Sequence, residues 1–206
     1  MNETYYETGY YKSPRGSIMN KVYGEPGSWA LGVFSIAFAF LGLNMFRIGT
    51  YLNLYNDGLL IGLIIGMIIH ESAHKYAGRR NGCVSMYVAT AWGVLVTIVS
   101  GFFPIKLLIP GFTSLMCFGR VSKEGEFEIS SWGPLTNIAL AIIAIVVYYI
   151  GIHSLFIQGF LVINVWLAVF NLLPIPPLDG WKMMKINPLK WGIMFVVSIL
   201  LFFAPL

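Results

Sequence analysis

The chain carries little charge for its length. Only 11% of its 206 residues are Asp, Glu, Lys or Arg, whereas 57% are hydrophobic. Soluble domains carry roughly 25% charged residues, so this composition is typical of a membrane protein. The net charge of +4 is small, and the positive residues lie beside apolar segments, which argues against a nucleic-acid partner. We therefore expect an integral membrane protein whose surroundings are the lipid bilayer.

Cysteines are also scarce. The two present, Cys83 and Cys117, form no CxxC pair and show no metal-ligand spacing. We predict that both are inert apolar residues rather than a disulfide or metal ligands. Residues 1–28 lack the hydrophobic stretch of a cleavable signal peptide, and they are predicted to form a polar N-terminal tail.

Apolar runs divide the rest of the chain, and a spanning helix needs about 20 such residues. The runs comprise residues 29–46, 59–77, 134–152, 155–173 and 191–206. Residues 87–118 are apolar but interrupted by prolines, and alternating polar residues in 119–131 predict a β-hairpin turning at Lys123-Glu124-Gly125. The predicted fold is an all-α polytopic membrane protein with five to six transmembrane helices, a small membrane-associated β-hairpin and a re-entrant segment. Residues 29–206 are predicted to form its single transmembrane domain.

Lysine and arginine favour cytoplasmic loops, so their distribution predicts the orientation. If residues 87–118 make an even number of passes, 12 of the 13 positive residues lie inside and only Arg47 lies outside. A single pass would place Arg120, Lys123 and three later lysines outside. We therefore predict a multi-pass protein of the cell membrane in which 87–118 is re-entrant or forms two short spans, and we favour the re-entrant form.

The second apolar run contains the sequence His70-Glu71-Ser72-Ala73-His74. Histidines at positions i and i+4 lie on one helix face, so both imidazoles can reach one metal ion, and Glu71 can take a proton from attacking water. Ionisable side chains inside a bilayer cost about 2.5–3.5 kcal/mol each, which favours a functional role. A polar helix–helix contact, or the interfacial end of the span, is the structural alternative.

Three glycines precede the histidines on the same helix face. Gly58, Gly62 and Gly66 are spaced four residues apart. Small residues at this spacing let a second helix approach closely. The histidine face is therefore predicted to pack against a partner helix rather than against lipid.

A catalytic zinc ion takes three protein ligands and keeps one position open. His153 and Asp57 lie in loops predicted to be on the opposite side of the membrane from His74. Asp179 lies on the same side as His74, after three prolines that end the 155–173 helix. Asp179 is therefore a candidate ligand, and the N-cap of a following short helix would explain it equally well.

Three motifs occur together in a characteristic order. HExxH lies in one predicted transmembrane helix, GPLTN (residues 133–137) opens a later one, and NxxPxxxLDG (residues 171–180) follows. This pattern resembles the site-2 proteases, which are intramembrane zinc metalloproteases of the M50 class, in a compact archaeal or bacterial form. The resemblance covers about residues 59–185.

The resemblance implies roles for individual residues. One zinc ion per chain would be bound by three side chains: His70, His74 and Asp179. Glu71 would activate water, and Asn171 would help to hold the substrate backbone or the developing oxyanion. Asn137 matches a position that packs the core helices. Residues 107–130 would present a strand edge to an extended substrate.

The function implied by the resemblance is hydrolysis of peptide bonds in or near transmembrane segments of membrane-anchored proteins. The active site would face the cytoplasmic side. Two alternatives are a membrane metal-binding or transport protein and a non-catalytic relative of the proteases. A metal transporter would not need Glu71, and a non-catalytic relative would typically have lost Glu71 or a ligand, whereas this chain retains the whole set.

Overall fold

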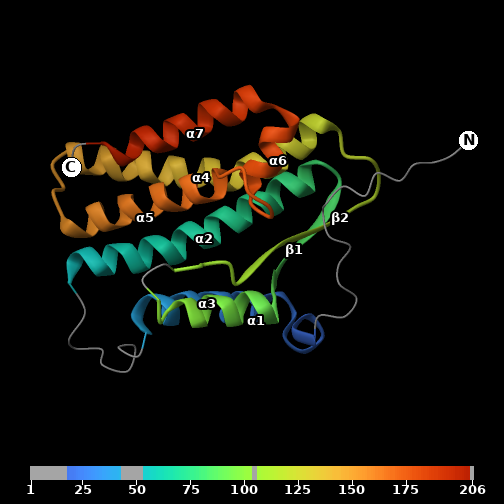
Figure 1. Cartoon of the computed structure of the whole chain (residues 1–206), viewed down its shortest axis with the longest axis horizontal. Coiled ribbons are helices and arrows are strands. Elements are labelled where there is room, and N and C mark those ends of the chain that lie inside the picture. The colour runs from blue at the N-terminus through green and yellow to red at the C-terminus, as the bar shows by residue number, and fades with distance from the viewer. Residues whose placement is uncertain (1–17, 43–52, 104–105, 205–206) are drawn as a thin grey trace, which may run out of the picture.

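The computed structural model describes residues 18–42, 53–103 and 106–204 (Figure 1). This part of the chain is mostly helical, with two short strands. Along the sequence the elements are α1 Ile18–Leu41, α2 Leu54–Arg80, β1 Cys83–Ala89, α3 Ala91–Ser100, β2 Gly111–Cys117, α4 Lys123–Tyr149, α5 Leu155–Leu172, α6 Asp179–Ile186 and α7 Pro188–Phe202.

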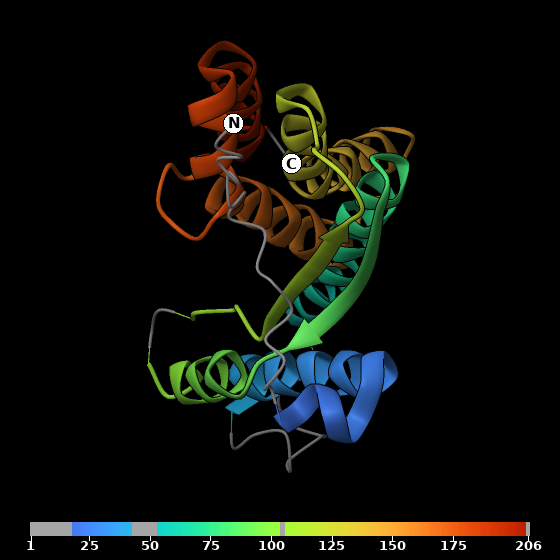
Figure 2. The same ribbon diagram turned by 90° about the vertical axis from the view of Figure 1, so that its right-hand side faces the viewer.

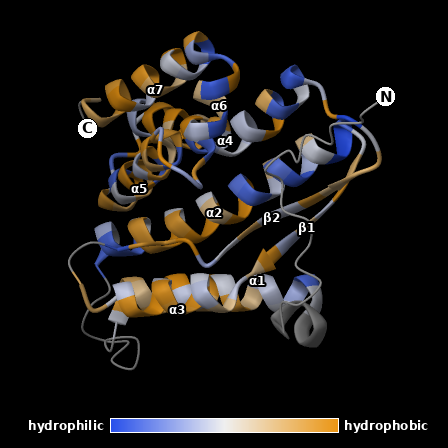
Figure 3. Ribbon diagram, turned by 45° about the vertical axis from the view of Figure 1, so that its right-hand side comes forward, coloured by the Kyte–Doolittle hydropathy of each residue, from blue (hydrophilic) through white to orange (hydrophobic). Residues whose placement is uncertain are grey.

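Within the described residues, three helices are long and apolar enough to cross a membrane. They are α2, α4 and α5. The predicted runs 59–77 and 155–173 are confirmed as helices, and 191–206 corresponds to α7, which is shorter than a typical span. The run 29–46 corresponds to α1, although its last predicted residues lie outside the described part. Figure 3 shows α3 and the middle of α2 as mostly hydrophobic, whereas both ends of α2 are hydrophilic.

Glycines let α2 and α5 pack at very short range, as the spacing of small residues predicts. A Cβ atom at Gly58 would overlap the carbonyl oxygen of Phe156, and one at Gly159 would overlap the carbonyl oxygen of Tyr55. A Cβ atom at Gly62 would lie 2.7 Å from the side chain of Ile163. The glycine face of α2, which continues to the histidines, is therefore covered by another helix.

The two strands form an antiparallel pair over seven residues each. Cys83 pairs with Cys117 at one end, and Ala89 pairs with Gly111 at the other. Residues 90–110, which include α3, therefore leave and return at the same point of the sheet. The even number of passes stays a prediction.

The hairpin predicted within residues 119–131 is wrong. Residues from Lys123 onward form the first turns of α4, which runs to Tyr149 and includes the predicted span 134–152 up to its last residues. Ser122 caps this helix by accepting a hydrogen bond from the backbone N–H of Gly125 at 3.0 Å. Acidic residues in the first turn, Glu124 among them, also favour a helix N-terminus there.

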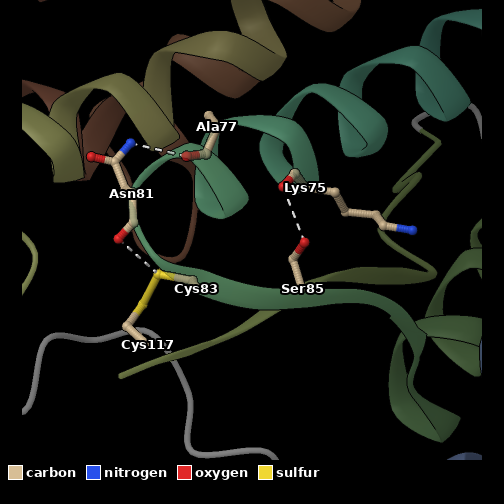
Figure 4. The surroundings of a disulfide bond; sticks show 6 residues. All are labelled: Lys75, Ala77, Asn81, Cys83, Ser85 and Cys117. Carbon is tan, nitrogen blue, oxygen red and sulfur yellow. Dashed lines mark hydrogen bonds between the residues drawn. A yellow bond between two sulfur atoms is a disulfide. The ribbon is translucent and has the colours of Figure 1, made fainter. Parts of the chain in front are cut away.

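The prediction for the cysteines is also wrong, because Cys83 and Cys117 form a disulfide (Figure 4). Residues that face each other across an antiparallel pair have neighbouring side chains, so the strand register brings the two sulfur atoms together. Nothing in the spacing of two isolated cysteines indicates such a partnership. The bridge lies beside the end of α2, where Ser85 donates a hydrogen bond to the carbonyl of Lys75 at 3.0 Å.

Two groups of elements lie on opposite sides of the sheet and α2. Helices α1 and α3 lie side by side below the strands, and α4 to α7 lie beyond α2 (Figures 1 and 2). The carboxylate of Glu25 links α1 to α2 and β1, because it pairs with Lys75 of α2 and accepts a hydrogen bond from the N–H of Tyr87 at 3.0 Å. Burial acts to raise the pKa of Glu25, but Lys75 and this N–H hold it below its usual range.

Candidate metal centre

Helix α2 brings His70 and His74 to one face, one turn apart. Both are buried, with 6% and 7% of their surfaces exposed. Their Nε2 atoms lie 3.0 Å from each other. The helical spacing that the sequence predicts therefore places both imidazoles at a single point.

Asp179 reaches the same point from the first residue of α6. Its Oδ2 atom lies 3.0 Å from Nε2 of His74 and 3.4 Å from Nε2 of His70. The proline-containing turn after α5 allows this, and Gly180 lies against the backbone of Leu172, where a Cβ atom would overlap it. Within the described residues, this trio is the one group of metal-binding side chains that converges.

The spacing of these three atoms fits a tetrahedral zinc site. Ligand atoms about 2.0–2.1 Å from a tetrahedral zinc ion lie roughly 3.3 Å from one another. The observed separations of 3.0–3.4 Å lie close to this value. Two neutral histidines and one carboxylate also form a donor set that zinc commonly takes in catalytic sites.

Hydrogen bonds to the second ring nitrogens fix the histidine tautomers. Nδ1 of His74 lies 2.7 Å from the carbonyl oxygen of Ile129, and Nδ1 of His70 lies 2.7 Å from Oδ1 of Asn137. Both partners accept hydrogen bonds, so both Nδ1 atoms donate, and the Nε2 lone pairs point at each other and at Asp179. Lone pairs and a carboxylate at this range repel one another unless a proton or a metal ion lies between them.

Gly133 leaves space beside the cluster. It lies on α4, and a Cβ atom there would overlap Nε2 of both His74 and His70. The first residue of the GPLTN motif therefore keeps the point of convergence clear of side-chain atoms.

The carboxylate of Asp179 is suited to hold a positive ion. Burial acts to raise its pKa, but the charge of a protonated His74 and hydrogen bonds from His70 and His74 hold that pKa well below the usual range of an aspartate. Lys182, one turn along α6, lies 4.0 Å from its second oxygen. The group is therefore ionised at neutral pH.

Glu71 lies next to His70 and is oriented by the sheet. The hydroxyl of Thr113 on β2 lies 2.8 Å from Oε2 of Glu71 and 3.0 Å from its backbone carbonyl oxygen. Glu71 does not belong to the converging trio, so its carboxylate is not one of the three candidate ligands.

A cavity of about 950 Å³ opens onto these side chains. Its wall includes both histidines, Glu71 and Asp179 together with five consecutive residues of β2, Gly111 to Leu115. Asn171 also lines the cavity, while its amide donates one hydrogen bond to the carbonyl of Leu167 at 2.9 Å. An asparagine amide has two N–H groups, so one is left for another acceptor.

Two residues, Asp57 and His153, are excluded as ligands by the predicted membrane orientation, and both lie away from the trio. Asp57 is in the first turn of α2, at the opposite end of the helix from His74. His153 packs against the ring of Tyr148 in the connection between α4 and α5.

Sequence reasoning did not assign the contacts of three residues around the cluster: Gly133, Asn137 and Thr113. The first two lie within GPLTN, so the motif itself marks them, although no local pattern shows that Asn137 faces His70. Thr113 lies in a strand whose pairing was not predicted, and no signal in the sequence links it to Glu71.

Similarity to known proteins agrees with this geometry. One Methanocaldococcus jannaschii protein, provisionally named a zinc metalloprotease, is 33% identical over 135 residues, which cover 60% of this chain and 67% of the relative. A second protein of that organism, named a zinc metalloprotease, is 27% identical over 103 residues, covering 48% of this chain and 28% of the relative. No family model and no solved structure matches the chain.

The first relative is similar over two thirds of its own length, and the three motifs and the converging His-His-Asp trio are those of a zinc metalloprotease. The chain therefore belongs to the site-2 protease-like family of zinc metalloproteases.

Proposed function

We propose that the chain is an intramembrane zinc metalloprotease that hydrolyses peptide bonds in or near transmembrane segments of membrane-anchored proteins. The observation that carries this proposal is the convergence of His70, His74 and Asp179 at the wall of a cavity, with Glu71 beside them. One zinc ion per chain would be held by the three converging side chains. The chain would lie in the cell membrane as a multi-pass protein.

The position of the site supports cleavage at membrane depth. The ligands lie on α2, which is one of the three helices long and apolar enough to cross a membrane, and at the start of α6. The ends of α2 and α4 near the site carry several charged side chains, which include Arg79, Arg80 and Lys123. Since positive residues favour the cytoplasmic side, we infer that the site opens toward the cytoplasm.

The proposed reaction adds water to a peptide carbonyl. When bound, zinc supplies a Lewis acid that polarises the carbonyl and lowers the pKa of water to about 7. Glu71 takes a proton from the attacking water while the water oxygen bonds to the carbonyl carbon. The same proton passes from Glu71 to the leaving amine when the C–N bond breaks. The hydroxyl of Thr113 holds the Glu71 carboxylate in place for both transfers.

Two features support binding of an extended peptide. Within the described residues, β2 pairs on one edge only, with β1, and five of its consecutive residues line the cavity. An unpaired strand edge can add a peptide strand through main-chain hydrogen bonds. The second N–H of Asn171 would donate to a substrate carbonyl or to the oxyanion that develops during hydrolysis.

Replacing Glu71 with Gln tests the proposal. In cells, the substrates should accumulate intact in the membrane proteome of the Glu71→Gln strain relative to wild type. In vesicles, the purified wild-type protein should cleave those same proteins, and the variant should not. The variant should still bind one zinc ion, because Glu71 lies outside the ligand trio.

Glu124→Gln is the matched control, since Glu124 is exposed at the start of α4 and does not line the cavity. It should cleave like the wild-type protein. Cleavage by Glu71→Gln at the wild-type rate would sink the mechanism. Zinc binding by a wild-type protein that cleaves no membrane protein would instead favour a metal-binding function.

A further inference from the structure

Behind His70 of α2 lie two buried side-chain amides, one on each of two neighbouring helices. They belong to Asn137 on α4 and Asn164 on α5, and both side chains are 0% exposed. Nδ2 of Asn137 donates to Oδ1 of Asn164 at 3.2 Å, and Oδ1 of Asn137 faces Nδ1 of His70 at 2.7 Å. Neither asparagine belongs to the ligand trio.

Backbone carbonyls fix the orientation of the side-chain amide of Asn164. Its Nδ2 donates to the carbonyl of Phe160 at 2.9 Å and lies 3.4 Å from the carbonyl oxygen of Gly62. A carbonyl oxygen only accepts hydrogen bonds, so the NH₂ end of this amide must point toward them and its oxygen must point toward Asn137.

The direction of Asn137 follows from that of Asn164. The two N–H groups of Asn137 find two acceptors, the oxygen of Asn164 and the carbonyl oxygen of Gly66 at 3.2 Å. Its oxygen is then left to accept from Nδ1 of His70. Reversing the Asn137 amide would place an N–H opposite Nδ1–H and would leave buried groups unpaired, which costs about 1–3 kcal/mol for each group.

Gly66 provides room for these two amides. A Cβ atom there would lie 2.6 Å from Oδ1 of Asn164 and 3.1 Å from Nδ2 of Asn137. The glycine face of α2 therefore leaves room for the two amides and also allows close helix packing.

We propose that Asn164 is a positioning residue that acts through Asn137 to keep the Nε2 lone pair of His70 directed at the metal cluster. This inference rests on the proposed zinc site. It extends that site to a residue of α5 that touches neither ligand nor cavity wall.

Zinc affinity of the full chain in detergent, measured by competition with a chelator, tests the proposal. Mutation of a residue that hydrogen-bonds a metal ligand typically lowers metal affinity about 10–100-fold. Asn137→Leu should therefore lower zinc affinity by about 10–100-fold, and Asn164→Leu should lower it about tenfold. The double variant should bind zinc no more weakly than Asn137→Leu, because Asn164 acts through that residue.

Val165→Ala is the matched control, as Val165 is the next residue on α5, is 1% exposed and packs toward α4 in an apolar cluster. It should lower thermal stability and leave zinc affinity unchanged. Asn164→Asp supplies a second variant, because a buried neutral carboxyl keeps an acceptor for Asn137 and a donor for Phe160. It should lose less affinity than Asn164→Leu.

Three results would overturn the inference: wild-type affinity in Asn164→Leu, losses that multiply in the double variant, or equal losses in the Asp and Leu variants. Each of these would leave the proposed function standing if the wild-type chain binds zinc. A wild-type chain that binds no zinc would overturn both.

Discussion

The helices α2, α4, α5 and α6 differ from the region formed by α1, α3, β1 and β2 in what they contribute to the site. The helices supply the three candidate ligands and the amides and carbonyls that orient them. The second region supplies one wall of the cavity and the hydroxyl that contacts Glu71. In the proposed function the metal ligands all come from the helices, whereas the strand that would bind a peptide comes from the second region and only Asn171 of α5 would contact the substrate from the helical side. Changes in the second region should therefore affect cleavage without affecting zinc binding.

The largest effect is expected in the helical region, on removal of a ligand. His74→Ala and Asp179→Ala should each weaken zinc binding by more than about 100-fold, since even outer partners cost 10–100-fold. Cleavage should be lost as well. The measurement is zinc content after dialysis, with His153→Ala as control because His153 lies outside the cluster. Zinc retention by Asp179→Ala would remove Asp179 from the ligand set.

Gly133→Ala should also abolish zinc binding, because the new Cβ atom would overlap Nε2 of both histidines. Alanine is favoured over glycine in a helix by about 1 kcal/mol, so the helix itself should tolerate the change. We expect the variant to bind no zinc and to keep its helical content, as measured by circular dichroism. Gly192→Ala, on α7 with open space at its Cβ position, is the control and should bind zinc normally.

Thr113→Val in the second region should have a smaller and different effect. It removes the hydroxyl next to Glu71 and keeps the side-chain shape, so kcat should fall about tenfold while zinc affinity stays constant. Thr136→Val is a suitable comparison, because the hydroxyl of Thr136 donates to its own helix, to the carbonyl of Gly133. An equal fall in kcat for both variants would argue against a role for Thr113.

Opening the disulfide should affect the site least. Cys83→Ser with Cys117→Ser removes a link between residues 34 positions apart, and such bridges contribute about 2–4 kcal/mol. Amide hydrogen exchange should become faster in β1 and β2 and stay unchanged in α4 and α5. Zinc affinity should not change, and a loss of zinc would show that the two regions are not separable.

Local patterns predicted the convergence of the two histidines well, and the sheet poorly, for a physical reason. His70, Glu71 and His74 lie within five residues of one helix, so their geometry follows from helical periodicity alone. Asp179 required the family motif, because proline and glycine place it without any periodic signal. The partner of β2 lies more than 20 residues earlier in the chain, and strand pairing at that distance leaves no local trace.

The start of α4 was predictable in principle. Ser122 and the acidic residues after it form a helix N-terminus signal, but their alternation with other residues also matches a strand. The contact of Asn137 with His70 was not predictable, because it depends on how α4 packs against α2.

X-ray absorption spectroscopy of the zinc-loaded protein tests the central claim most directly. We predict one zinc ion per chain with two imidazole nitrogens and one carboxylate oxygen among its nearest neighbours at about 2.0–2.2 Å. The imidazole scattering should decrease in His74→Ala. A zinc ion with sulfur neighbours, or a spectrum that His74→Ala leaves unchanged, would contradict the account.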